Sequence, residues 1–301
     1  MSDAALVFEK VTRRFRGTIA LDAVDLEVPQ GTIVGVIGRN GAGKTTALRL
    51  ALGHLWPDSG QVRTLGLDPA HRGKEVRTRA ALLSDESALY PWMTIEEIVR
   101  FAAALHPKWD ADLAARLGRD LELEPKKRIR TLSRGTRAKV SLLLAVASRP
   151  ELLLLDDPTA GLDPLVRREV LDGILDAVSG AGGSVVYASH LVHDVERVAD
   201  RVVVLDGGRI RIEGDLDGLK ARIRRARAIV EGELRPAEIP GAIDVVRDGR
   251  LLVVTADGDG RDLEAALRRL GAREIVIEPL PLEEILVALL REGQGEEVAH
   301  V

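Results

Sequence analysis

The chain contains no cysteine among its 301 residues, which excludes disulfides, cysteine zinc sites, iron–sulfur clusters and thiol nucleophiles. It also has no excess of positive charge: 43 Lys+Arg stand against 47 Asp+Glu, and a nucleic-acid binder needs a basic surface to neutralise phosphates. The opening residues lack the basic start and apolar core of a secretory signal. The longest apolar runs, 140–147 and 152–155, are far shorter than the ~20 residues of a membrane helix. We therefore expect a soluble, intracellular protein that binds no nucleic acid and needs a partner for any membrane role.

Short apolar runs alternate with segments of helical pattern, which indicates an α/β fold with a parallel sheet covered by helices. Hydrophobic residues make up 46% and charged residues 30%, as is typical of a soluble globular chain long enough for one large domain and a small one. Helices are expected from about residues 164 and 191. The other expected elements are a helix at 44–52 and buried strands at 33–37, 80–83, 152–155, 184–188 and 201–205.

The pattern changes twice along the chain. Residues 94–147 show helical periodicity in three pieces, which predicts a helical insert. Near residue 215 a basic helix is expected at 216–225, with Arg222, Arg224, Arg225 and Arg227 on a solvated face. We therefore predict a large domain at 1–222, with a helical subdomain at about 86–150, and a small α+β domain at 223–301. The small domain is expected to hold strands at 228–234, 243–246, 251–255 and 274–277 and helices at 263–270 and 282–290.

A glycine-rich segment follows the first buried strand and precedes a helix. Residues 38–45 read GRNGAGKT and fit the pattern G-x-x-x-x-G-K-[ST] in the strand–loop–helix context that it requires. Glycines let backbone N–H groups curl around phosphate oxygens, and the helix start adds partial positive charge. Lys44 can bridge the β- and γ-phosphates, and the Thr45 hydroxyl can coordinate Mg²⁺. The segment predicts a nucleoside triphosphate site formed by Gly38, Arg39, Asn40, Gly41, Ala42, Gly43, Lys44, Thr45 and Thr46.

A second part of this site is predicted where the strand at 152–155 runs into two aspartates. Ligands of open α/β sheets bind at the carboxyl ends of the strands, so Asp156 is expected beside the glycine-rich loop. There it would hold Mg²⁺ directly or through water, and the cation would relieve the repulsion between Asp156 and Asp157. The alternative is a purely structural pair in a helix-capping turn.

Residues 132–136 read LSRGT and start a helix. Ser133 is placed to cap that helix and Gly135 permits close approach, which makes the segment a second anion site. Placed ahead of the LLLLDD strand, it resembles the LSGGQ signature of the ATP-binding cassette (ABC) ATPases. Other family motifs follow in order, PTAGLD at 158–163 and YASH ending at His190. Over about residues 5–215 the sequence is similar to this family.

The resemblance implies a P-loop NTPase cassette with a parallel-sheet core, an antiparallel β part and the helical insert, which hydrolyses ATP with Mg²⁺. It implies that Phe15 stacks on adenine, with plain core packing as the alternative, and that His190 contacts the γ-phosphate. In this family two subunits close head to tail, so a second ATPase subunit, identical or different, is expected. Its contribution to the nucleotide site would be the equivalents of Ser133, Arg134, Gly135, Thr136 and Asp163. His54 and His193 are expected to be incidental.

Two positions depart from the family pattern. Asp157 stands where a glutamate usually acts as the general base, and its carboxylate is one methylene shorter. A displacement of about 1 Å can cost on the order of 10²-fold in rate, so slow hydrolysis is one hypothesis and a compensating backbone shift is the other. Asp85 is aligned with the family's glutamine, where a carboxylate can still coordinate Mg²⁺. The neighbouring Leu89, Tyr90 and Trp92 are candidates for a permease contact or for core packing.

A single cassette without long coiled coils leaves importers and exporters as the transport classes. The C-terminal part resembles the accessory domain of bacterial exporter ATPases, although a generic dimerisation module is the alternative. We therefore expect the ATP-hydrolysing subunit of an ABC exporter, held on the cytoplasmic face of the membrane by a separately encoded integral-membrane permease. The alternatives are a nucleotide-dependent regulator outside transport and a slow-hydrolysing partner subunit of a heterodimeric transporter.

Overall fold

The computed structural model of the chain describes residues 4–84, 89–181, 183–231 and 239–292. The chain divides into two compact units, Met1–Ile210 and Arg211–Val301. The border falls inside strand β9 (Arg209–Asp215), which is earlier than the limit at residue 222 expected from the sequence. The assignment of these parts as a cassette and an accessory domain stays a prediction.

A six-stranded sheet forms the middle of the first unit, in the order β5-β6-β7-β3-β8-β9. Strands β3 and β7 are buried along their whole length, as expected for parallel strands covered on both faces. The buried strands predicted from apolar runs are confirmed, whereas β9 was missed because its residues alternate between exposed and half-buried. The parallel strands are β3 (Ile33–Ile37), β5 (Ala80–Ser84), β6 (Leu152–Asp156), β7 (Ser184–Ser189) and β8 (Arg201–Asp206).

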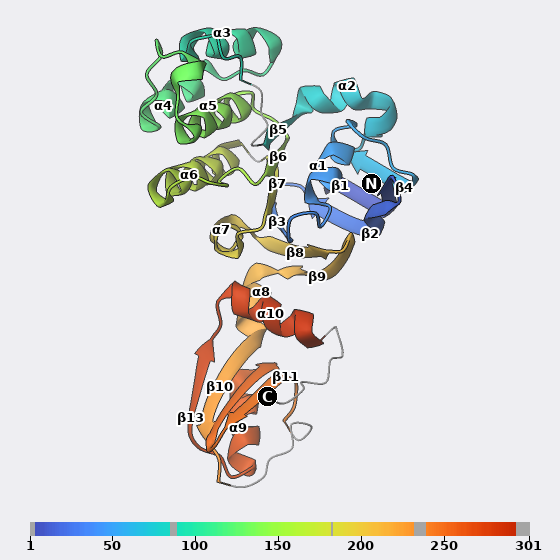
Figure 1. Ribbon diagram of the computed structural model, residues 1–301, viewed down its shortest axis with the longest axis vertical. Helices are drawn as coiled ribbons and strands as arrows, with labels where there is room; N and C mark the ends of the chain where they lie inside the picture. Colours follow the sequence, from blue (N-terminus) through green and yellow to red (C-terminus); the bar gives the residue numbers. More distant parts are fainter. Residues whose placement is uncertain (1–3, 85–88, 182, 232–238, 293–301) are drawn as a thin grey trace. The chain divides into compact units, whose positions relative to one another are not determined.

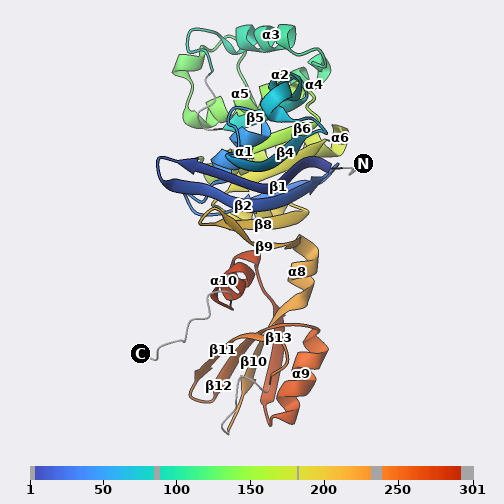
Figure 2. The same ribbon diagram turned by 90° about the vertical axis from the view of Figure 1, so that its right-hand side faces the viewer.

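A three-stranded antiparallel sheet lies beside this central sheet, with helix α1 (Lys44–Ala51) between the two (Figure 1). Its strands are β1 (Ala4–Phe15), β2 (Thr18–Pro29) and β4 (Ser59–Thr64), in the order β2-β1-β4. Figure 2 shows this sheet in front of the central one. Side chains from both sheets and from α1 form one buried core, which includes Leu6, Phe8, Leu50, Leu154 and Val203.

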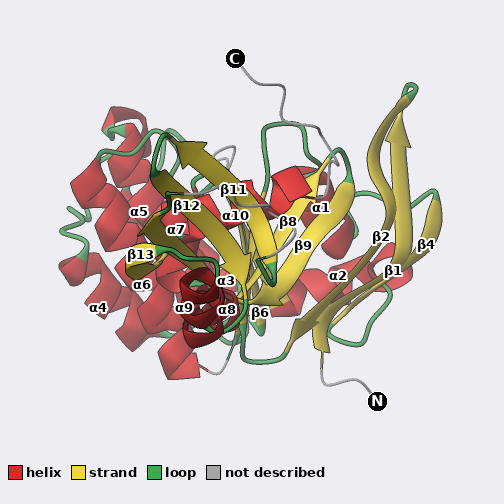
Figure 3. Ribbon diagram, turned by 90° about the horizontal axis from the view of Figure 1, so that it is seen from below, coloured by secondary structure: helices red, strands yellow, loops and turns green. Residues whose placement is uncertain are grey.

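Helices cover the opposite face of the central sheet and its β5 edge. Figure 3 shows α4, α5 and α6 on the side of the unit away from β1, β2 and β4. Each of the three helices predicted in the insert begins at a polar cap: Thr94, Asp110 and Ser133 accept a backbone N–H near the start of their helices. The helices of the unit besides α1 are α2 (Pro69–Arg79), α3 (Ile95–Leu105), α4 (Ala111–Asp120), α5 (Arg134–Ala147), α6 (Pro164–Ala181) and α7 (Val192–Val198).

The second unit is a four-stranded antiparallel sheet in the order β11-β12-β10-β13. Helix α9 packs on one face through a core that includes Ala226, Val254 and Leu267. A smaller cluster joins α10 to the sheet through Ile223, Leu280 and Ile285. The elements are α8 (Leu216–Arg222), β10 (Ile223–Ile229), β11 (Ala242–Asp248), β12 (Leu251–Asp257), α9 (Gly260–Arg269), β13 (Arg273–Pro279) and α10 (Leu282–Glu292).

The basic helix predicted at 216–225 is wrong in its second half. Helix α8 ends at Arg222, and Arg224, Arg225 and Arg227 lie on strand β10. The strand prevails because Ala226 and Ala228 face the core in alternation, and Arg225 and Arg227 form ion pairs across the unit. Arg225 pairs with Glu284 at 2.5 Å and Arg227 with Glu278 at 3.0 Å. The strand expected at 228–234 thus begins earlier, at Ile223, and part of its expected range lies outside the described residues.

Glu151 lies just before β6 and bonds to residues at the N-terminal ends of β5 and β7. Its backbone N–H donates to Arg79 just before β5, and its carbonyl accepts from Ser184 at the start of β7. Its carboxylate accepts bonds from Arg79, at 2.6 and 3.1 Å, and from Lys108 at 2.9 Å. The hydrogen bonds from Arg79 first, and then that from Lys108, lower the pKa of Glu151 from 4.5 to about 2.

Replacement of this carboxylate should cost stability at neutral pH and progressively less as the pH falls. Because the folded pKa lies below the ordinary value, the charge of Glu151 stabilises the fold above pH 4.5, and this contribution disappears as the pH falls towards 2. We expect Glu151→Gln to lower the free energy of unfolding by about 0.5–1 kcal/mol at pH 7, since the side chain is 36% exposed. Urea unfolding should show this deficit shrinking between pH 4.5 and 3. Glu124→Gln, which removes an exposed pair with Lys127, is the control and should cost less at pH 7. A deficit that is constant with pH would contradict the assignment.

Candidate active site

The glycine-rich loop connects β3 to α1 and leaves no room for side chains at two positions. Gly43 begins the helix in the left-handed region, with φ of 110°, and a Cβ there would lie 2.3 Å from the carbonyl oxygen of Ala20. A Cβ on Gly38 would lie 2.5 Å from the carbonyl oxygen of Leu205. The close backbone packing explains why glycine is needed at both. Around this frame, Ala42 and Gly43 are buried, whereas Arg39, Asn40, Gly41 and Thr45 are exposed and Thr46 is half-buried.

Lys44 fills the hollow that the loop encloses. It is only 6% exposed, and its Nζ donates to the carbonyl of Gly38 at 2.8 Å and of Arg39 at 3.4 Å. The Asp157 carboxylate lies 3.8 Å away and balances its charge. A buried ammonium needs such partners, and phosphate oxygens can replace the two carbonyls as acceptors.

Asp156 ends β6 and shares a hydrogen bond with the Thr45 side chain at the start of α1. Burial raises the pKa of Asp156, and the neighbouring charge of Asp157 raises it further, against the lowering effect of Thr45. No group of three His, Asp or Glu side chains suited to a metal gathers within the described part of the chain. The Thr45 hydroxyl and the Asp156 carboxylate nevertheless fit Mg²⁺, which takes one or two carboxylates together with substrate phosphates.

Asp157 and His190, predicted as the catalytic pair, are brought together. Asp157 Oδ1 accepts a bond from His190 Nδ1 at 2.7 Å, from the His190 backbone N–H at 3.1 Å and from Ser189 Oγ at 3.0 Å. The Asp157 backbone is in the left-handed region, with φ of 45°, a conformation that aspartate adopts more readily than most residues. Its N–H donates to the Ala188 carbonyl at 2.8 Å.

This bonding fixes the chemistry of His190. Because a carboxylate can only accept, Nδ1 carries the proton, and Nε2 is left for a ligand. Nε2 can donate to a phosphate oxygen only when the ring carries both protons. Ser189 was missed by the sequence reasoning, although a small polar residue directly before His190 at a strand end was the available signal.

The signature segment builds a separate surface. Ser133 is exposed and caps α5, accepting the backbone N–H of Thr136 at 3.1 Å, while the two hydroxyls lie 2.9 Å apart. Gly135 packs against Val166 of α6, where a Cβ would lie 3.3 Å from a methyl group. Figure 1 shows α5 and α1 on opposite faces of the central sheet. The helix that begins at the signature therefore lies across the central sheet from the chain's own glycine-rich loop.

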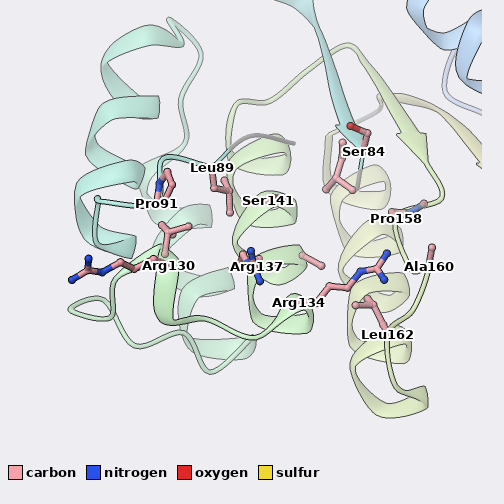
Figure 4. Close-up of a pocket in the computed structure, with 13 residues that line it drawn as sticks. Ser84, Leu89, Pro91, Arg130, Arg134, Arg137, Ser141, Pro158, Ala160 and Leu162 are labelled. Atoms are coloured by element: carbon pink, nitrogen blue, oxygen red, sulfur yellow. The ribbon is translucent and has the colours of Figure 1, made fainter. Parts of the chain in front are cut away.

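Arg134 links the signature to the loop that follows Asp157. In Figure 4 its side chain points towards Pro158 and Ala160 across a cavity of about 430 Å³ that Arg130 and Arg137 also line. A Cβ on Gly161 would lie 2.3 Å from the Arg134 guanidinium, so glycine makes room for the arginine. Asp85, the predicted metal ligand after β5, lies outside the described residues.

The remaining predicted residues sit at exposed ends of elements. Asp163 caps α6 by accepting the backbone N–H groups of Leu165 and Val166, both at 3.1 Å. Phe15 lies at the tip of the β1–β2 hairpin, 39% exposed, so the alternative of plain core packing is wrong. The Arg13 guanidinium lies 4.7 Å from the centre of its ring. His193, expected to be incidental, instead lies 3.0 Å from a buried carboxylate, that of Asp194.

Comparisons with known proteins agree with this arrangement. A family model described as ABC transporter matches residues 21–160. The daunorubicin resistance ATP-binding protein DrrA3 of Streptomyces coeruleorubidus is 34% identical over 310 residues, covering 100% of this chain and 96% of that protein. The Nod factor export ATP-binding protein I of Cupriavidus metallidurans is 32% identical and covers 70% of this chain and 71% of its own length. A solved structure of an ATP-binding subunit of an ABC transporter superposes with a TM-score of 0.65 at 27% identity, covering 72% of this chain and 92% of that one.

Removal of the Asp156 carboxylate should separate nucleotide binding from metal binding. Asp156→Asn is expected to lower the affinity of the site for Mg²⁺ by roughly 10- to 100-fold, because an oxygen that holds the metal is lost. ATP binding should then gain less from added Mg²⁺ than it does in the wild type. Titration with a fluorescent ATP analogue, in Mg²⁺ and in EDTA, measures this. Thr45→Ser keeps the hydroxyl and should resemble the wild type. Equal Mg²⁺ dependence in Asp156→Asn and the wild type would contradict the metal assignment.

Proposed function

The chain belongs to the ABC transporter family as an ATP-binding, ATP-hydrolysing subunit, and from this premise we propose that it drives an exporter whose permease is a separate chain. The observation that carries the catalytic part is the cluster of Lys44, Asp157 and His190 beside the glycine-rich loop. Export is supported by relatives named for drug resistance and for export, one of which is matched over this whole chain, its C-terminal unit included. That unit would then be an accessory domain of the exporter.

In the proposed reaction each residue has a task set by its position. Lys44 exchanges the carbonyls of Gly38 and Arg39 for β- and γ-phosphate oxygens, and exposed Phe15 offers a face to adenine. Asp157 Oδ1 is engaged by His190 and Ser189, so Oδ2 is the oxygen that orients the attacking water. Mg²⁺ held by Thr45 and Asp156 would neutralise charge on the phosphates.

The site is completed by a second subunit. Because α5 lies across the central sheet from the chain's own loop, we propose that Ser133, Arg134, Gly135 and Thr136 act on nucleotide held by another subunit. Backbone N–H groups at the start of α5 supply a favourable site for the γ-phosphate of that nucleotide. Asp163 and the loop before it would lie at the same interface.

The role of Asp157 can be tested by two substitutions. Asp157→Asn removes the charge that orients water and should lower kcat by roughly 10²-fold or more, whereas Asp157→Glu keeps it. Phosphate release by the purified full-length chain, with ATP binding measured in parallel, gives the comparison. ATP affinity should stay within a few-fold, since both variants keep the glycine-rich loop and the Lys44 bonds to the carbonyls of Gly38 and Arg39. Full activity in Asp157→Asn would show that this carboxylate is not the base.

A group of exposed aromatic residues supports docking to a permease. Tyr90 and Trp92 are 39% and 61% exposed, with ring centres 5.2 Å apart, and Phe101 packs edge-on against Tyr90 at 5.5 Å. Tyr90 and Phe101 line a groove of about 380 Å³ together with Leu89 and Leu105, and Trp92 lies beside Tyr90, so these exposed rings are not core residues of the insert. None of the described helices has the length and apolarity to cross a membrane. We infer that this groove receives a permease segment at the cytoplasmic face.

Loss of this surface should separate transport from hydrolysis. Trp92→Glu places a charge against Tyr90, which lines the groove, so we expect the permease encoded with this chain to co-purify in much lower yield from detergent extracts. Basal ATP hydrolysis by the isolated chain should be unchanged, because Trp92 lies outside the nucleotide site. Trp56→Glu, at an equally exposed tryptophan outside the groove, is the matched control. Undiminished co-purification of the Trp92 variant would contradict the docking surface.

A further inference from the structure

A buried chain of polar groups lies directly behind Asp157 and His190. Thr159 and Tyr187 are fully buried, and Asp194, at the start of α7, is 1% exposed. Thr159 Oγ1 donates to Asp194 Oδ2 at 2.6 Å and lies 3.2 Å from the Tyr187 hydroxyl. Since Thr159 has one hydroxyl proton and gives it to the carboxylate, Tyr187 must donate to Thr159. Burial raises the pKa of Tyr187, so the tyrosine keeps its proton.

The carboxylate of Asp194 is buried and lies beside an arginine and a histidine. Arg167 Nε lies 3.9 Å from Oδ2, and His193 Nε2 lies 3.0 Å from Oδ1. Arg167 also contacts His193, at 3.0 Å. Removing a buried anion from water is costly, and a position that keeps one must hold it for structure or for chemistry.

The arrangement of the bonds favours a role in the chemistry over a purely structural one. The bonded residues form a closed ring that includes Asp157 and His190. Asp157 and Thr159 are two residues apart on the loop between β6 and α6. His190 lies on the loop after β7, and Asp194, four residues later, lies in the first turn of α7. Asp157 Oδ1 joins the two segments through Ser189 and His190, and Thr159 joins them in the interior through Asp194 at 2.6 Å. The interior bond therefore supports the spacing of the two segments on which the Asp157–His190 contact depends.

We propose that Asp194 is a positioning residue for ATP hydrolysis, which holds the His190 loop against the Asp157 loop through its hydrogen bond from Thr159. Thr159 also leads into the segment 160–163, which the proposed function places at the interface between subunits. A displacement of this segment by an arriving subunit therefore reaches the Asp157–His190 contact through Thr159 and Asp194. The inference rests on the proposed roles of Asp157 and His190.

The test compares three threonine variants of the full-length chain. Thr159→Val keeps the shape but removes the bond to Asp194, so kcat for ATP hydrolysis should fall about tenfold while KM for ATP stays within about twofold. Thr159→Ser restores the hydroxyl and should restore kcat. Thr64→Val is the matched control, because Thr64 is equally buried and donates one bond, to the Ala51 carbonyl. It should lose similar thermal stability and keep kcat.

Several outcomes would overturn the proposal. An unchanged kcat in Thr159→Val, a loss no larger than in Thr64→Val, or a change confined to KM would each reduce Asp194 to a structural residue. Should Thr159→Val not fold, Tyr187→Phe decides in the same assay, since it removes only the donor to Thr159. A smaller fall in kcat at unchanged KM is expected there, and wild-type kcat would contradict the inference.

His190→Ala separates this inference from the proposed function. It should abolish most hydrolysis, and adding Thr159→Val to it should cause no further loss, because both act on one contact. Wild-type hydrolysis in His190→Ala would overturn the proposed function itself. Loss of activity in His190→Ala together with wild-type kcat in Thr159→Val would overturn only the role of Asp194.

Discussion

The register of three parallel strands determines where the candidate site lies. Ile37 at the end of β3 pairs with Ser189 of β7, and Asp156 at the end of β6 pairs with Ala188. The next residue along each strand is therefore brought to the same edge of the sheet: Gly38, His190 and Asp157. A shift of one residue in any of these pairings would turn a side chain to the other face and separate the group. Pairing of the buried apolar strands thus brings the charged residues of the site together.

The charges at this edge are balanced within the protein. Lys44 is buried and bonded to two carbonyls, with Asp157 within 4 Å, and burial raises the pKa of Asp156. A site of this kind binds a phosphate–metal group by exchanging partners. The Lys44 ammonium exchanges carbonyl oxygens for phosphate oxygens. The Asp156 carboxylate gains a cation, which offsets the cost of burying its charge. The favourable part of binding is the difference between these two sets of contacts.

The sequence allowed prediction of those parts that depend on local pattern. Continuous apolar runs located β3, β6, β7 and β8, and the glycine pattern located the phosphate loop, because each is specified within a few neighbouring residues. The antiparallel strands of the first unit were not located, since strands of 12 residues such as β1 mix buried and exposed positions irregularly across bulges. Arg225 and Arg227 were assigned to a helix because their pairing with glutamates on other elements is a tertiary property. The Thr159–Asp194 bond joins residues that are 35 positions apart in the sequence, so no local pattern predicts it.

The two surfaces that would meet in a dimer are each complete before they meet. Ser133 already caps α5 and Asp163 already caps α6, so the backbone at both helix starts is fixed by bonds within the chain. On the other surface, the glycine-rich loop is held by close backbone contacts at Gly38 and Gly43. Ordering flexible segments at an interface costs free energy, and surfaces fixed beforehand avoid most of that cost. In the proposed dimer, the free energy of closure would then depend chiefly on the nucleotide and its Mg²⁺, because neither subunit supplies their charge. Hydrolysis changes that charge and divides the nucleotide, and would therefore be the step that reverses closure.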